Sequence, residues 1–330
     1  MADSAAASAL SNVTASIWSV ALPLPWPLKT VNVFLARRND GYLLIDCGLK
    51  TADSLATLTA ALDELRIGWR DIREIIVTHM HPDHVGAASH IRELSGAPVL
   101  MHPAEARWVA PRAAGEPFFS RTADYLSVHG FSVAEIEELK SHAREVSDAV
   151  ERLQPDREIN EGDVVPCETG ALETIVAPGH SPGLLSFHAP GERLYLSTDV
   201  ILETISPNIG FHPFSEGNPL GDYLASLERL DRLDVETVVP SHGPPFRGFR
   251  ERIAATREHH QRRLERVRNA VPATGLTAYD VAGIVWRREL SPMDRRFAMA
   301  EALSHLVYLE QQSEIGSELR EGVQFWTAAC

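Results

Sequence analysis

The stretch Val77–Ala87, "VTHMHPDHVGA", decides the fold of this chain. It carries four metal-capable side chains within six residues, directly after the apolar run "REIIV". His79 and His81 are two residues apart, so in extended backbone they project from the same side. Asp83 and His84 follow at the turn into the next helix, where the chain reverses and presents them to a neighbouring point. The layout predicts two adjacent ligand sets at the end of a buried strand.

Three more candidate ligands stand where other apolar runs end. His180 lies in "VAPGHSPG", Asp199 in "YLSTDV" and His242 in "VVPSHGPP". Each precedes small or turn residues, so each is expected at a sheet edge, where loops build functional sites. Imidazole and carboxylate ligands without thiolate suit zinc, iron or manganese, and zinc is the commonest of these in hydrolysis. Together with the first stretch, these residues predict a metal site.

The organisation of the chain changes twice along its 330 residues. Up to about residue 248, strand-like runs such as "TVNVFLA" and "GYLLIDCG" alternate with helical patterns. Residues 103–155 interrupt this alternation as a helical insertion. Residues 249–330 contain three helical patterns and a tail, "SEIGSELREGVQFWTA", that can form a small hairpin. We therefore expect a catalytic domain at 1–248 and a small, winged-helix-like accessory domain at 249–330.

The composition of the chain indicates in which cellular compartment to expect the protein and which classes of partner are disfavoured. The formal net charge of −14 disfavours non-specific attraction to nucleic acid or anionic lipid. The three cysteines are far apart and form no CxxC pair, so neither a disulfide framework nor a thiolate zinc site is indicated. The first residues lack the basic and apolar regions of a secretory signal, and no run approaches the roughly 18 apolar residues of a membrane span. We expect a cytoplasmic protein without a membrane partner.

The same residues carry a resemblance to a known family. The His-x-His-x-Asp-His motif, a later Gly-His, an Asp after a strand and a final Gly-flanked His are similar to the metallo-β-lactamase fold superfamily. The resemblance implies an α/β fold, the αββα sandwich, with the site along one edge. It divides the ligands between a first metal (His79, His81 and His180) and a second metal (Asp83, His84 and His242), with Asp199 bridging the two. It also implies that Asp46, in "LLIDCG", orients a ligand such as His84 or a site loop.

The resemblance further implies a metal-dependent hydrolase. Two divalent ions, zinc by expectation and iron or manganese as alternatives, would lower the pKa of a bridging water and supply hydroxide at neutral pH. Asp83 would take up a proton and pass it to the leaving group, so Asp83 and Asp199 are the candidate catalytic residues. The architecture resembles the lactamase-beta-2-like, hydroxyacylglutathione-hydrolase-like branch with a C-terminal winged-helix-like domain. That branch mixes activities, so architecture alone does not assign the substrate.

The sequence is compatible with three hypotheses about function. The leading hypothesis is hydrolysis of a small thioester, lactone or carboxylic ester. The alternative is a phosphodiesterase or single-strand endoribonuclease with the same centre, which requires basic or stacking residues leading to the site. Residues 245–330 carry 13 Arg against 11 Asp and Glu, so we expect that region to serve packing or homodimer formation rather than nucleic-acid binding. A DNA-binding regulatory module is the third hypothesis, and the complete ligand set argues against it.

The wall of the substrate pocket is a further expectation. Phe118, Phe119 and Tyr125 in the insertion, with Trp26 in "PWPL", could line an apolar entrance for a small-molecule substrate. The insertion's aromatic residues could equally form a core of their own or a dimer contact. His212, in "GFHPF", could donate a hydrogen bond to substrate, or be a solvent-exposed loop histidine.

Overall fold

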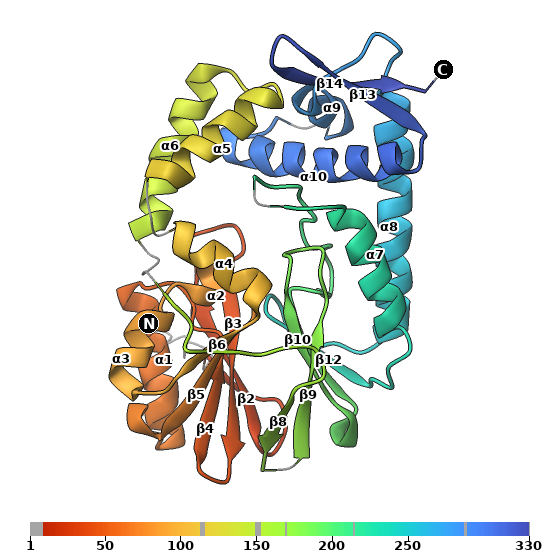
Figure 1. The fold of residues 1–330 in the computed structure, drawn as a ribbon. Helices are drawn as coiled ribbons and strands as arrows, with labels where there is room; N and C mark the ends of the chain where they lie inside the picture. Colours follow the sequence, from red (N-terminus) through yellow and green to blue (C-terminus); the bar gives the residue numbers. More distant parts are fainter. Residues whose placement is uncertain are drawn as a thin grey trace, which may run out of the picture.

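Two β-sheets face each other in this computed structural model, and helices cover their outer faces (Figure 1). The structure describes residues 9–112, 116–148, 153–168, 170–213, 215–286 and 289–329. In spatial order the first sheet contains β1 (Leu10–Asn12), β2 (Ile17–Pro23), β3 (Thr30–Arg38), β4 (Gly41–Ile45), β5 (Ile72–Val77), β6 (Val99–Met101) and β7 (Arg157–Glu158). The second contains β12 (Thr237–Pro240), β11 (Leu194–Thr198), β10 (Leu185–Ala189), β9 (Gly170–Val176) and β8 (Val164–Cys167). Both sheets mix parallel and antiparallel pairs, and the expected sandwich is confirmed.

Strand β5 shows why the sequence folds in this way. It pairs in parallel with β4 on one side and with β6 on the other, so neither of its edges is free. Ile76 belongs to the core between the two sheets, with Phe34 and Phe187. Ile75 and Val77 point the other way, into the core beneath the flanking helices. A continuous apolar run is the pattern expected of a strand that is buried on both faces.

Helices α1 (Ala52–Leu65) and α3 (Ala88–Ser95) cover the outer face of the first sheet, where Leu58 and Ile91 enter its core. Helix α7 (Pro219–Leu230) packs on the outer side of the second sheet. The short α2 (Pro82–Val85) and two 3-10 turns, Trp69–Asp71 and Pro190–Glu192, complete this part of the chain. Asn218 caps α7 by accepting a hydrogen bond from Gly221 N at 2.9 Å.

The insertion and the C-terminal segment are helical, as expected. The insertion contains α4 (Pro103–Arg112), α5 (Glu116–Val128) and α6 (Val133–Asp148). The C-terminal segment contains α8 (Phe249–Ala270), α9 (Ala278–Val285), α10 (Pro292–Gln311) and the hairpin of β13 (Ile315–Arg320) and β14 (Val323–Ala328). Thr277 caps α9 in a reciprocal pair with Asp280, and Ser291 caps α10. Within the described residues, no helix has the length and apolar character needed to cross a membrane.

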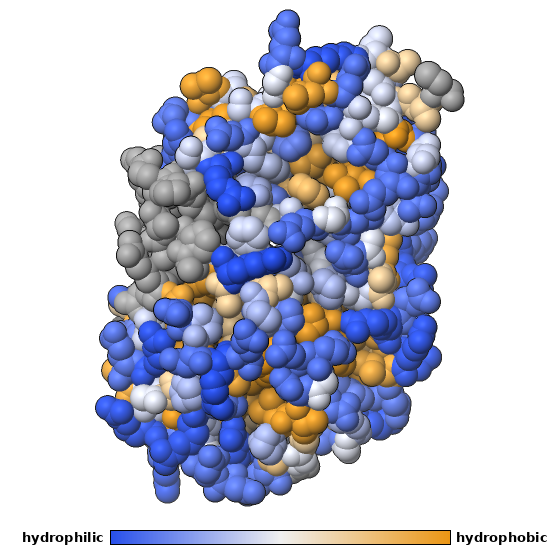
Figure 2. All heavy atoms as spheres, in the orientation of Figure 1, coloured by the Kyte–Doolittle hydropathy of each residue, from blue (hydrophilic) through white to orange (hydrophobic). Residues whose placement is uncertain are grey.

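One hydrophobic core joins the insertion to the C-terminal helices. Phe131 of the insertion lies in the same cluster as Val281 of α9 and Met299 of α10. The Phe131 ring meets the Tyr279 ring edge-on at 4.9 Å, and the Tyr279 hydroxyl donates to Glu135 Oε1 at 2.6 Å. Helices α5 and α6 therefore pack with the accessory helices rather than forming a separate core, whereas Val109 of α4 packs in the core of the first sheet. The face in Figure 2 is largely hydrophilic, with hydrophobic areas between the hydrophilic residues.

Candidate metal centre

The candidate ligands meet because several strands end at one edge of the sandwich. Strands β4 and β5 are parallel, so Asp46 and His79 follow them at the same edge of the first sheet. Strands β9 and β11 both run antiparallel to β10, and β12 is parallel to β11. His180, Asp199 and His242 therefore leave the second sheet at one edge. The seven predicted ligands form two neighbouring groups within the described chain, with ligand atoms inside each group within 4.8 Å of one another.

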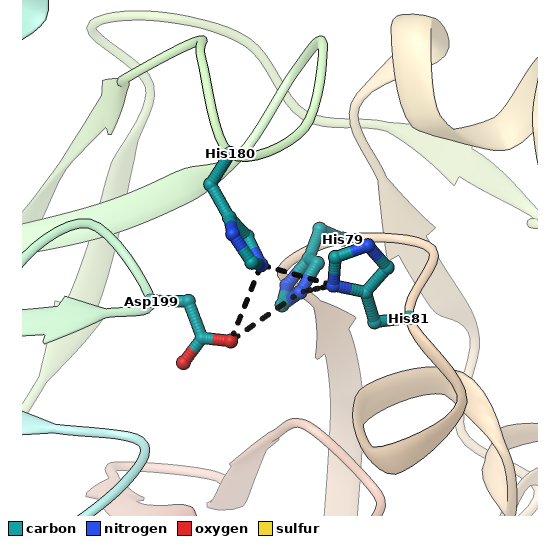
Figure 3. A group of neighbouring side chains, drawn as sticks. All are labelled: His79, His81, His180 and Asp199. Atoms are coloured by element: carbon teal, nitrogen blue, oxygen red, sulfur yellow. Dashed lines mark hydrogen bonds and ion pairs between the residues drawn. The ribbon is translucent and has the colours of Figure 1, made fainter. Parts of the chain in front are cut away.

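The first group contains His79, His81, His180 and Asp199 (Figure 3). The Nδ1 atom of His81 lies 2.9 Å from His79 Nε2 and 2.9 Å from His180 Nε2. Asp199 Oδ2 lies 3.7 Å from His79 Nε2 and 3.5 Å from His180 Nε2. Three ring nitrogens and one carboxylate oxygen thus converge on one point.

The second group contains Asp83, His84 and His242. Asp83 Oδ2 lies 3.3 Å from His242 Nε2 and 3.6 Å from His84 Nε2. Asp199 reaches this group as well, because its Oδ2 is 3.4 Å from His84 Nε2 and its Oδ1 is 3.6 Å from His242 Nε2. The division between the groups matches the one expected from the sequence, and Asp199 lies between them.

Hydrogen bonds on the far side of the rings direct these imidazoles. His84 Nδ1 donates to Asp46 Oδ2 at 2.7 Å, and His242 Nδ1 donates to the Thr30 carbonyl at 2.8 Å. His180 Nδ1 donates to the Asn208 carbonyl at 2.9 Å. A ring that donates from Nδ1 presents the lone pair of Nε2 to the centre, which is the tautomer a metal ion requires.

Asp46 supports more than one ligand. Besides His84, it accepts hydrogen bonds from Thr78 N at 2.8 Å and from Thr78 Oγ1 at 2.9 Å, and Thr78 precedes His79. Asp46 is completely buried and adopts a left-handed backbone with φ of 64°. A non-glycine residue held in that region is uncommon and often marks a functional site.

The chemistry of the donor set fits divalent cations. Two buried atoms at the centre, His84 Nε2 and Asp199 Oδ1, have no hydrogen-bond partner among the residues that the structure describes. Burial and the neighbouring histidines hold the pKa of His79 well below its usual range, so its imidazole is neutral. Burial opposes ionisation of Asp199, yet His242 and His84 hold the pKa of its carboxyl well below the usual value. Neutral imidazole and ionised carboxylate are the forms that bind metal.

The surroundings of His84 also favour a bound cation. Burial alone would lower its pKa, but Asp46, Asp83 and Asp199 together raise the pKa well above the usual value. Three buried or nearly buried carboxylates around one imidazole leave excess negative charge, which is costly in a low-dielectric interior unless cations offset it.

Glu105 of α4 is a residue of the site that sequence reasoning missed. Its side chain is fully buried, and its Oε2 accepts from Met80 N at 2.9 Å while its Oε1 accepts from Gly183 N at 2.6 Å. Met80 lies between the ligands His79 and His81, and Gly183 comes three residues after His180. One carboxylate therefore holds two loops, the one that carries His79 and His81 and the one that carries His180. Burial raises the pKa of Glu105. A glutamate in the first turn of a helix usually faces solvent, so no pattern distinguished it.

The predicted pocket residues have varied surroundings. The Tyr125 hydroxyl donates to the Phe211 carbonyl and lies 3.8 Å from Met299 Sδ, so it joins the insertion to α10. Trp26 is half-buried against the core of the first sheet. His212 is half-buried, and its backbone N–H donates to Ser215 Oγ at 2.9 Å. The side chains of Phe118 and Phe119 lie outside the described part of the structure. A role for any of these residues in binding substrate stays a prediction.

Comparisons with known proteins agree with this geometry. Residues 26–242 match the model of the metallo-beta-lactamase superfamily, and residues 264–328 match the model described as metallo-beta-lactamase-like, C-terminal domain. A probable metallo-hydrolase of Bacillus subtilis, YqjP, is 27% identical over 317 residues, covering 92% of this chain and 95% of its own length. The acyl-coenzyme A thioesterase MBLAC2 of Gallus gallus is 29% identical over 219 residues, covering 64% of this chain and 72% of its own.

A solved structure supports the fold over nearly the whole chain. The beta-lactamase domain protein from Burkholderia ambifaria superposes with a TM-score of 0.87 at 31% identity, covering 99% of this chain and 97% of its own. The family model spans more than half of the sequence and includes all seven candidate ligands. The chain therefore belongs to the metallo-beta-lactamase superfamily, and it is a metallo-hydrolase of that fold.

Proposed function

We propose that the centre holds two divalent ions, zinc being the expected metal, and that the protein hydrolyses a small thioester, ester or lactone. The position of Asp199 carries this proposal. Its two oxygens lie 3.4 Å and 3.6 Å from ring nitrogens of the second group, and Oδ2 also faces the first group. A carboxylate shared in this way suits a pair of ions better than a single one.

The protein's own residues supply binding, orientation and proton transfer. When bound, the ions would lower the pKa of a water molecule and polarise the carbonyl oxygen of the substrate. Asp83 Oδ2 is at the edge of the second group, with 11% of the side chain exposed. It is ionised, because His84 and His242 lower its pKa although burial opposes them. Asp83 can therefore take up a proton at Oδ2 and release it to the leaving group.

The expected substrate class is an acyl thioester. MBLAC2 of Gallus gallus, which is named an acyl-coenzyme A thioesterase, matches this chain over 219 residues, and this likeness supports the choice of a thioester. A thiol leaves more readily than an alcohol because its pKa is lower, near 8.5. Asp83 alone is then a sufficient acid, and no second proton donor beside the leaving group is required.

A substrate panel tests the proposal. The metal-free protein, with and without restored zinc, would be assayed on an acyl thioester, an aryl ester, a lactone, bis-(p-nitrophenyl) phosphate and single-stranded RNA. We expect zinc-dependent turnover of the carbonyl substrates, with the thioester fastest. Zinc-dependent cleavage of the phosphodiester or RNA, with no carbonyl turnover, would replace this proposal with the phosphodiesterase alternative.

A further inference from the structure

We propose that helices α8 and α10 of the C-terminal domain support one ligand of the metal centre. Asn208 is a positioning residue that acts through His180, and Glu301 of α10 holds Asn208 in place. This inference rests on the proposed role of His180 as a metal ligand. Figure 1 shows α10 crossing above the edge of the sheets where the ligand loops lie.

The first step of the chain of contacts is the hydrogen bond from His180 Nδ1 to the Asn208 carbonyl at 2.9 Å. Asn208 belongs to the loop between β11 and α7, which begins at Asp199. The bond places the proton on Nδ1 and turns Nε2 toward His81 and Asp199. A shift of the Asn208 carbonyl would therefore turn the His180 ring away from the other ligands.

The second step fixes this loop on α10. The Asn208 side-chain amide donates to Glu301 Oε2 at 3.2 Å and to the Phe297 carbonyl at 3.4 Å. Three residues further along, Phe211 N donates to the Ala300 carbonyl at 2.9 Å. These contacts are made to neighbouring turns of one helix. We therefore infer that the position of the loop depends on α10 rather than on the strands that precede it.

The third step fixes Glu301 itself. Arg263 of α8 contacts Glu301 Oε1 at 3.0 Å, and the two side chains are only 12% and 13% exposed. The guanidinium also lies over the Trp286 ring, 4.0 Å from its centroid. Partners with few alternative positions lose little entropy when they hold a third group. One oxygen of Glu301 thus contacts the Arg263 guanidinium, and the other accepts from the Asn208 amide.

A different function for the same cluster is less consistent with these contacts. His259, His260 and Glu301 have ligand atoms within 4.8 Å of one another, which is a spacing that a metal ion could use. The Arg263 guanidinium already contacts the Glu301 carboxylate, and a bound cation would lie close to that positive charge. The cluster therefore favours a structural link over a further metal site.

The chain offers a matched control for this link. Gln311, near the end of α10, accepts a hydrogen bond from the Asn218 side chain at 2.7 Å. This bond also joins α10 to the loop after β11, but it is exposed and lies ten residues further along the loop from Asn208. Gln311→Ala therefore removes a comparable contact without changing the support of His180.

The test measures Co²⁺ binding to the metal-free full-length protein by visible absorption, with urea unfolding of each metal-free variant beside it. We expect the unsubstituted protein to bind two equivalents and His180→Ala to lose one. Asn208→Ala and Glu301→Gln should bind one of the two equivalents about tenfold more weakly, at the lower end for residues that orient a ligand. Gln311→Ala should bind both as the unsubstituted protein does.

The outcomes separate this inference from the proposed function. Failure of the unsubstituted protein to bind two equivalents would overturn the dinuclear centre and this inference with it. If two equivalents bind and both Asn208→Ala and Glu301→Gln retain full affinity, only the positioning role is overturned. Equal weakening in Gln311→Ala would overturn it too, because the effect would then be general loosening. If Glu301→Gln fails to fold, Asn208→Ala tests the positioning role alone, because Asn208 is only half-buried and its loss is easier to tolerate.

Discussion

Asp46 accepts a hydrogen bond from His84 at 2.7 Å, and both side chains are completely buried. An amide at position 46 would keep the size but lose the charge and one acceptor. We therefore expect Asp46→Asn to weaken binding of one of two Co²⁺ equivalents by roughly 10- to 100-fold. Asp40→Asn is the control, because Asp40 is 63% exposed at the β3–β4 turn. Equal affinity in Asp46→Asn and the control would show that Asp46 does not support a ligand.

Glu105→Gln should damage the site through its loops. One oxygen of Glu105 would become an NH₂ group facing a backbone N–H, either that of Met80 or that of Gly183. A buried donor left without an acceptor costs about 1–3 kcal/mol, so the free energy of unfolding should fall by that amount. Zinc-dependent turnover should fall with it, whereas Glu93→Gln, on the exposed side of α3, should change neither. Unchanged urea unfolding would contradict the role assigned to Glu105.

The ligands and their supporting residues differ in how far sequence could predict them. His79, Asp199 and His242 follow apolar strands directly, so a local pattern identifies them. Glu105 accepts hydrogen bonds from backbone N–H groups 25 and 78 residues away. The Asn208 carbonyl accepts one from the His180 side chain, 28 residues away. Such contacts depend on tertiary packing, which local periodicity does not encode.

The strands show the same limit. Strand β5 is buried on both faces and reads as a continuous apolar run. Strands β1 and β7, with three and two residues, are too short to show any alternation, and the sequence did not predict them. The shared core of the insertion and α10 was not predicted either, because amphipathic helices indicate a buried face but not the partner that covers it.

Asp199→Asn tests the shared carboxylate. The amide is neutral and has one acceptor oxygen, so it cannot serve both groups of ring nitrogens at once. We expect zinc-dependent turnover to fall by more than about a hundredfold, and the bound metal measured by elemental analysis to fall below two equivalents. His90→Ala, in α3 and outside both groups, should retain full metal content. Two retained equivalents in Asp199→Asn would exclude a bridging role.

Acid should destabilise the protein through a buried histidine pair between α8 and α10. His260 Nδ1 lies 3.2 Å from His305 Nε2, and neither side chain is exposed. Burial, with neighbouring positive charge, lowers the pKa of His260 to about 2, and burial lowers that of His305 to about 3. Unfolding returns both to about 6.5, so below that pH the unfolded chain binds more protons and stability falls as pH falls.

The size of this effect can be isolated with one substitution. Below pH 6.5 each such histidine should lower the free energy of unfolding by about 1.4 kcal/mol per pH unit. His260→Leu removes one titrating group and places an apolar side chain beside Tyr223. Urea unfolding of the metal-free protein between pH 6 and pH 5 should therefore show a shallower pH dependence in His260→Leu, by about that slope. Gln311→Ala, at the end of α10, is the control and should leave the slope unchanged, since it removes no titrating group. An identical slope in His260→Leu would mean that His260 is not neutral in the folded protein.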